Sequence, residues 1–275
     1  MTTAFVLGGG GHLGAHEVGM LRALHERGIR PDVIVGTSIG ALNGAAFATT
    51  GDGSAIDRLA ETWTSIDRSG VLDNSFVERL KTLWSTKTHL YDNDRFRRLV
   101  ADAVGTDSFD DLAVPFECVA ASIERSSAVY LSSGSLVDAI LASSAVPGLL
   151  PPVEIDGEHH LDGGLVASIP LDRAIRRGAS TVYVLQVGRI EDPLTAPTKP
   201  WEVAMIAFEI SRRHRFAEAM RDLPDGVAVH VLPTGDAKSF NDLSQYGGTT
   251  GDEAKERIEQ SYRATGVYLD ERDDP

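Results

Sequence analysis

The stretch Val33-Ile34-Val35-Gly36-Thr37-Ser38-Ile39-Gly40 decides the fold class of this 275-residue chain. Its first three residues form a short, wholly apolar run, which is typical of a buried strand. The run closes in a turn that holds a serine between two glycines, and the small-residue segment Ala41 to Ala48 then reads as a helix. A strand that passes through a tight turn directly into a helix is a building unit of α/β folds.

The same unit occurs once before, at the N-terminus. The apolar run Thr3 to Leu7 ends in Gly8-Gly9-Gly10-Gly11, and apolar residues at helical spacing follow from Val18 to Leu24. Two consecutive units of this kind indicate a parallel sheet whose ligand crevice lies at the carboxyl ends of the strands. We therefore expect an α/β fold, a single three-layer α/β/α domain over residues 1–270 with a mainly parallel central sheet.

The rest of the chain alternates between strand-like and helix-like patterns. Further strands are predicted at Phe116 to Ile123, Ala128 to Leu131, Val153 to Ile155, Thr181 to Val187 and Val227 to Leu232. Helices are predicted at Leu136 to Ser144, Leu171 to Arg177, Trp201 to Arg221 and Asp252 to Thr265, and a helical insertion at Ser54 to Val104. The proline-rich segment Ile190 to Pro200 predicts a loop, and the acidic residues 271–275 a frayed tail.

The overall composition limits the classes of partner and the cellular location that we expect. With 42% hydrophobic residues the chain has material for a sizeable core, and its formal net charge of −14 disfavours nucleic acid as a partner. One cysteine, Cys118, rules out an internal disulfide framework and fits a cytoplasmic location. Residues Met1 to Leu7 lack the basic region of a signal peptide, and no apolar run approaches a membrane span. We expect a soluble protein whose contact with lipid is peripheral.

Ser38 is the first candidate for chemistry. A serine on a tight strand-to-helix turn exposes its hydroxyl at the crevice, where the amides of the following helix face any negative charge that develops on a substrate oxygen. Five residues alone could equally form an ordinary glycine-serine turn. The valine-rich run before Ser38 and the alanine-rich segment after it favour the nucleophile.

The loop Gly9-Gly10-Gly11-His12-Leu13-Gly14 also matches the dinucleotide-binding fingerprint. That interpretation requires an acidic residue near the end of the next strand, and Val33-Ile34-Val35-Gly36 offers none. The phosphate-loop interpretation fails because no Gly-Lys-Ser/Thr follows. An oxyanion loop remains: the amides of Gly9, Gly10 and Gly11, together with that of Ile39, are the candidate donors.

A third motif, Asp162-Gly163-Gly164, follows the alternating segment Val153 to Leu161. Alone it could be a plain turn. Together the three motifs make the chain resemble the patatin-like phospholipases, which carry a glycine-rich loop, a Gly-x-Ser-x-Gly elbow and a late Asp-Gly-Gly or Asp-Gly-Ala. The motif glycines here are Gly14, Gly36, Gly40, Gly163 and Gly164. Further stretches that resemble the family are Gly19 to Leu24, Gly36 to Asn43 and Ala142 to Gly148, and the similarity covers roughly Ala4 to Val187.

The resemblance implies a lipid acyl hydrolase with a catalytic dyad and no histidine. Ser38 would attack an ester carbonyl, and Asp162 would act as its base and later activate the water that hydrolyses the acyl-enzyme. A carboxylate is a weak base for a hydroxyl, so this chemistry needs a site that raises its basicity. The implied substrate is an acyl ester of a glycerophospholipid or another lipid, with no metal or organic cofactor.

One position departs from the family. Members usually carry Arg or Lys just before the last glycine of the first loop, where this chain has Leu13. The neighbouring His12 is a possible substitute. Two alternatives therefore stay open: a soluble short-chain esterase or thioesterase, and a non-catalytic regulatory module that kept the fold.

Other side chains are assigned structural roles. A serine-histidine-acid triad is disfavoured because Ser38 follows only the second strand, and His159 and His160 are predicted as partly exposed residues of a strand leading to Asp162. No His, Cys or carboxylate spacing indicates a metal site. The apolar stripe Phe76, Leu80, Leu83 and Trp84 is predicted to pack on the sheet, with a lid as the alternative. The run Arg212 to Arg215 is predicted as a solvated helix face, with a head-group site as the alternative.

Overall fold

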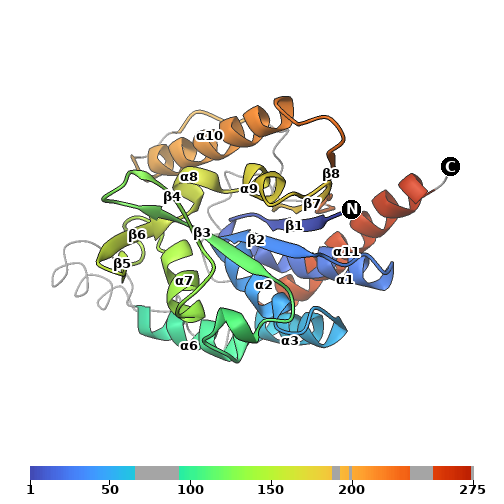
Figure 1. The fold of residues 1–275 in the computed structure, drawn as a ribbon, viewed down its shortest axis with the longest axis horizontal. Helices are drawn as coiled ribbons and strands as arrows, with labels where there is room; N and C mark the ends of the chain where they lie inside the picture. The colour runs from blue at the N-terminus through green and yellow to red at the C-terminus, as the bar shows by residue number, and fades with distance from the viewer. Residues whose placement is uncertain (66–92, 188–192, 198–199, 236–249, 274–275) are drawn as a thin grey trace.

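A computed structural model describes residues 1–65, 93–187, 193–197, 200–235 and 250–273. An eight-stranded mixed sheet lies between two layers of helices (Figure 1), which confirms the three-layer α/β/α prediction. The strands are β1 (Thr3–Leu7), β2 (Val33–Thr37), β3 (Phe116–Ser122), β4 (Ser127–Leu131), β5 (Val153–Ile155), β6 (Glu158–Asp162), β7 (Thr181–Leu185) and β8 (Ala228–Val231).

The sheet has a parallel body and an antiparallel end. Five strands run parallel in the order β3-β2-β1-β7-β8. The hairpin β5-β6 and strand β4 pair antiparallel at the β3 end. The β1 and β2 carboxyl ends therefore emerge side by side at one edge of the sheet, which is where the glycine loop and the serine turn begin.

Strand β3 has an unusual set of neighbours. Its residues Cys118 and Val119 pair with both β2 and β4, and Ala120 to Ser122 pair with both β4 and β6. Because a strand has only two edges, β4 occupies one of them while β2 and β6 share the other, one after the other. Since β6 runs antiparallel to β3, the carboxyl ends of β2 and β6 point toward each other.

Helices cover both faces of the sheet. One layer contains α1 (Ala15–Glu26), α2 (Ile39–Ala48), α3 (Gly53–Thr64), α6 (Asn93–Val104), α7 (Leu136–Ser143) and α11 (Gly251–Asp273). The other layer contains α8 (Gly164–Ala167), α9 (Leu171–Arg176) and α10 (Pro200–Arg221) (Figure 1). Two 3-10 turns, η1 (Gly11–Gly14) and η2 (Phe109–Asp111), complete the described elements.

The alternation of side chains along the strands produces two cores. In β1, Phe5 and Leu7 join the larger core under α1 and α2, whereas Ala4 and Val6 join the smaller core under α9. Both faces of a parallel strand are thus buried, which explains why these strands read as continuous apolar runs. Cys118, in β3, is buried.

The structure refines several predicted boundaries. Strand β2 continues through Gly36 and Thr37, and a separate strand, β6, forms a hairpin with β5 through a turn at Asp156 and Gly157, both at positive φ. Helix α11 continues to Asp273, well past the predicted end at Thr265 and into the tail that was expected to fray. The stripe from Phe76 to Trp84 lies outside the described residues. Within the described ranges, no helix is both long and apolar enough to cross a membrane.

Candidate active site

Ser38 occupies the sharp turn between β2 and α2. Its φ of 55° and ψ of −123° lie in a region that favours glycine, so a serine here carries backbone strain. The two flanking glycines are required by space: a Cβ on Gly36 would lie 2.5 Å from the Gly40 carbonyl oxygen, and a Cβ on Gly40 would lie 2.5 Å from the Leu7 carbonyl oxygen. The elbow predicted from the sequence is therefore present as a backbone geometry.

Asp162 meets Ser38 at this turn. Ser38 Oγ donates a 2.7 Å hydrogen bond to Asp162 Oδ2. The two residues are 124 positions apart in the sequence. They come together because Ser38 directly follows the end of β2, and Asp162 is the last residue of the oncoming β6.

The Asp162 carboxyl group is deeply enclosed, with only 1% of the residue exposed. Burial raises its pKa to about 6, against the opposing effects of the hydrogen bonds from Ser38 and from the Gly164 amide. The Gly164 amide donates to Asp162 Oδ1 over 2.7 Å, which leaves Oδ2 directed at the serine. A carboxylate with a raised pKa is a better proton acceptor than an ordinary surface aspartate and is still ionised at neutral pH.

The C-terminal end of α7 holds both members of the pair. Ser143 Oγ accepts a 2.9 Å hydrogen bond from the Ser38 amide, and the Ser143 carbonyl accepts one of 3.2 Å from the Gly163 amide. The Asp162 amide donates to the Ala145 carbonyl over 2.9 Å. Ser143 lies in a stretch that the sequence analysis matched to the family, but no role was predicted for its side chain.

The glycine loop packs against the same turn. Gly9 lies so close that a Cβ on it would be 3.3 Å from Ser38 Cβ. The Gly9 amide already donates to the Ser168 carbonyl over 3.0 Å, so the prediction that Gly9 supplies an oxyanion donor is not supported. Gly10 and Gly11 lead into η1, and Ile39 opens α2, where the first amides of a helix have no intrahelical acceptor. These three amides remain the candidate donors.

A buried polar network that was not predicted supports the far end of this loop. Asn43 Nδ2 donates to the Gly14 carbonyl over 3.0 Å and to Glu17 Oε2 over 2.7 Å, and Asn43 Oδ1 accepts from Trp63 Nε1 over 3.0 Å. Burial raises the pKa of Glu17 well above its usual range. The available signal was a single asparagine inside the otherwise apolar helix that follows Ser38, since a buried amide requires partners.

No cation comes from within the loop. Leu13 is buried and apolar. Burial, with a smaller effect from Arg257, lowers the pKa of His12, so His12 is uncharged at neutral pH and does not replace the basic residue of the family. Arg257 donates to the His12 carbonyl over 3.2 Å.

Two other predictions about charged and polar side chains need correction. His160 was expected to be partly exposed but is buried, because β6 turns it toward the protein interior, whereas His159 is exposed and pairs with Glu124. Arg212 was expected on a solvated helix face, but its side chain is buried between α10 and the chain after β7. His214 and Arg215 of the same helix are exposed. Among the described residues, no histidine ring is hydrogen-bonded to Ser38 or Asp162, and no cluster of three His, Cys, Asp or Glu side chains is placed to hold a metal.

Comparison with known proteins identifies the family of this chain. A model of the patatin-like phospholipase family matches residues 5–175. The patatin-like phospholipase domain-containing protein 7 of Rattus norvegicus is 35% identical over 195 residues, which cover 70% of this chain and 14% of the rat protein. Lysophospholipase nte1 of Aspergillus niger is 32% identical over 191 residues, which cover 70% of this chain and 12% of the fungal protein. This chain therefore spans a small part of its relatives' length.

A solved structure supports the fold. The crystal structure of VipD from Legionella pneumophila matches with a TM-score of 0.53 over 98% of this chain and 67% of the other. The sequence identity in that comparison is 15%, so the likeness concerns the fold alone.

Proposed function

Because the chain belongs to the patatin-like phospholipase family, we propose that it is a serine acyl-hydrolase that cleaves carboxylic esters of lipids. Ser38 is the nucleophile and Asp162 is the general base. The hydrogen bond of 2.7 Å from Ser38 Oγ to the buried Asp162 carboxylate is the observation that carries this proposal. A hydrogen bond of this length supports direct proton transfer from the serine to the carboxylate.

In the proposed reaction, Ser38 Oγ attacks the ester carbonyl carbon while its proton passes to Asp162 Oδ2. The carbonyl oxygen becomes an oxyanion that faces the amides of Gly10, Gly11 and Ile39. Collapse of this intermediate breaks the bond to the alcohol, which leaves with the proton from Asp162. Asp162 then accepts a proton from water, and the water oxygen attacks the acyl carbonyl carbon. The bond from that carbon to Ser38 Oγ breaks, Ser38 Oγ takes the proton back from Asp162, and the fatty acid is released.

The environment of Asp162 supports its role as the base. Its pKa of about 6 leaves it ionised at neutral pH, yet high enough to favour proton transfer from a hydroxyl. The strained turn at Ser38 supports the role of the serine, because sparsely populated backbone conformations of this kind cluster at active sites.

The names of the relatives support a lipid substrate. They include lysophospholipases and patatin-like phospholipase domain-containing proteins. We propose a lipid ester with one accessible acyl chain as substrate, reached through peripheral contact with a membrane. The one cysteine of the chain is a buried free thiol, which suits the reducing cytoplasm where we place the reaction.

Hydrolysis of lysophosphatidylcholine and of p-nitrophenyl esters of graded chain length tests the proposal. The native chain should turn over, whereas Ser38→Ala and Asp162→Asn should lose at least about a thousandfold in kcat. Asp156→Asn is the matched control, because it makes the same change on the exposed turn before β6 and should keep full activity. Absence of turnover by a correctly folded native chain would favour the non-catalytic regulatory module instead. Turnover of short p-nitrophenyl esters alone would favour a short-chain esterase.

A further inference from the structure

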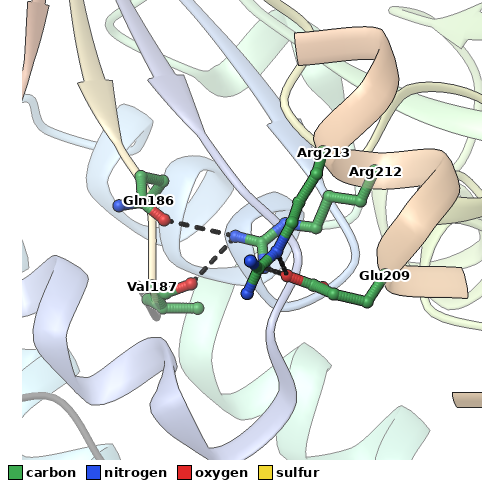
Figure 2. Close-up of polar contacts among 5 residues, drawn as sticks. All are labelled: Gln186, Val187, Glu209, Arg212 and Arg213. Atoms are coloured by element: carbon green, nitrogen blue, oxygen red, sulfur yellow. Dashed lines mark hydrogen bonds and ion pairs between the residues drawn. The ribbon is translucent and has the colours of Figure 1, made fainter. Parts of the chain in front are cut away.

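Helix α10 inserts a buried arginine beside the glycine loop. The Arg212 side chain is 4% exposed, and its guanidinium group reaches the chain just after β7 (Figure 2). Arg212 Nη2 donates to the Val187 carbonyl over 2.8 Å and to Gln186 Oε1 over 3.3 Å. The planar guanidinium group of Arg212 is therefore hydrogen-bonded to two consecutive residues of that segment.

The charge of Arg212 is balanced within the same helix. Arg212 Nη1 lies 3.3 Å from Glu209 Oε2, and the Glu209 side chain is 2% exposed. Arg213 shares the same carboxylate through a 2.8 Å contact (Figure 2). A buried ion pair of this kind contributes little net stability, because desolvation offsets its attraction. Its main consequence is geometric, since it fixes where the guanidinium group lies.

The segment that Arg212 binds, Gln186 and Val187, packs against the glycine loop. The Gly8 amide donates to the Leu185 carbonyl over 2.9 Å, so the chain after β7 runs beside the chain after β1. A Cβ on Gly8 would lie 3.6 Å from Gln186 Cα, and a Cβ on Gly10 would collide with Val187 Cγ2. Movement of Val187 would therefore change the space that positions the Gly10 amide.

We propose that Arg212 is a positioning residue that holds the glycine loop through Val187, in place of the basic residue that the family carries at the position of Leu13. The proposal rests on the proposed function of that loop as the oxyanion site. It assigns a functional role to α10, which lies beyond the residues 5–175 that match the family model. The loop itself contains no cation, and two arginines reach it or its neighbour from other elements: Arg257 donates to the His12 carbonyl, and Arg212 donates to the Val187 carbonyl.

The experiment uses three variants of the full chain. Arg212→Met removes the hydrogen bonds to Gln186 and Val187. The double variant Glu209→Gln/Arg212→Met removes both charges of the buried pair, in case the single change prevents folding. Arg213→Met is the matched control, because Arg213 contacts the same Glu209 carboxylate while Arg212 still reaches Val187. Lysophosphatidylcholine hydrolysis gives kcat and KM, and amide hydrogen exchange is followed in peptides covering Gly8–Gly14 and α2.

We expect kcat to fall by roughly 10- to 100-fold with KM little changed in both Arg212 variants, because displacement of a catalytic group by about 1 Å has effects of this size. Amide exchange should rise over Gly8–Gly14 and stay unchanged in α2, and Arg213→Met should behave as the native chain. Unchanged exchange over Gly8–Gly14 in both Arg212 variants, or a loss confined to KM, would overturn the role of Arg212. An inactive native chain would instead count against the proposed hydrolase, while the exchange data would still decide whether Arg212 holds the loop.

Discussion

Thr37 and Asp162 pair with successive residues of the same β3 edge, Thr37 with Val119 and Asp162 with Ala120. Strands β2 and β6 thus meet end to end along β3, and the residue after Thr37 is Ser38. The sheet itself sets the separation between the two side chains, since backbone pairing fixes both strand ends. A rigid scaffold of this kind suits chemistry that depends on positioning.

The pH dependence of hydrolysis should follow Asp162. Only the ionised carboxylate can accept the serine proton, and burial raises its pKa to about 6. We expect kcat/KM to rise about tenfold per pH unit below this value and to level off above it. Initial rates of fatty-acid release between pH 4.5 and 8.5, quantified by mass spectrometry, give the profile. A flat profile between pH 5 and 7 would rule out Asp162 as the base.

Asp162→Asn should make the protein more stable at neutral pH. The folded state raises the pKa of this carboxyl group from 3.8 to about 6, so between these values the folded chain holds a proton that the unfolded chain has lost. The native free energy of unfolding therefore falls as pH rises through this window, and asparagine avoids the loss. The variant should gain about 3 kcal/mol above pH 7 and little at pH 4. Urea denaturation at both pH values measures the difference, and an equal gain at pH 4 would contradict it.

Ser38→Gly should be more stable than Ser38→Ala. Both variants lose the hydrogen bond to Asp162, but alanine keeps a Cβ at a φ of 55° and ψ of −123°. Relief of strain in the folded state outweighs the greater freedom of glycine in the unfolded chain, which leaves a difference of about 1 kcal/mol. Equilibrium unfolding of the two variants measures it. Equal stabilities would mean that the turn stores no strain.

Ser143→Ala should lower kcat about tenfold without a comparable change in KM. The substitution removes the acceptor of the Ser38 amide, whose hydrogen bond helps to fix the turn. Ser144→Ala is the control, because Ser144 is a neighbouring buried serine whose hydroxyl has no hydrogen-bond partner among the described residues. Equal kinetics of the two variants would show that the Ser143 hydroxyl does not position the nucleophile.

Much of the fold was accessible from local pattern. The apolar runs of β1 and β2 and the turns after them are local features, and they carried the α/β prediction. The pairing of β6 with β3 was not accessible, because an antiparallel hairpin can join either edge of a sheet and the sequence does not specify which. The end-to-end meeting of β2 and β6 therefore emerged only from the structure.

The residues of the candidate site also fall into two groups, those that the sequence predicts and those that only the structure reveals. Ser38, Asp162 and the glycines around them stand in short motifs whose backbone requirements are readable from the residues. Ser143, Asn43 and Arg212 act through contacts between distant segments, and each looks ordinary in its local sequence. Arg212 in particular sits in a basic run that reads as surface, because its burial depends on the length of α10 and on where β7 ends.

The most direct test of the central claim is covalent labelling by a fluorophosphonate, followed by peptide mass mapping. The account predicts one adduct per chain, located on Ser38, with much slower labelling of Asp162→Asn and none of Ser38→Ala. An unlabelled native chain, or an adduct on another residue, would contradict the assignment of Ser38 as a nucleophile activated by Asp162.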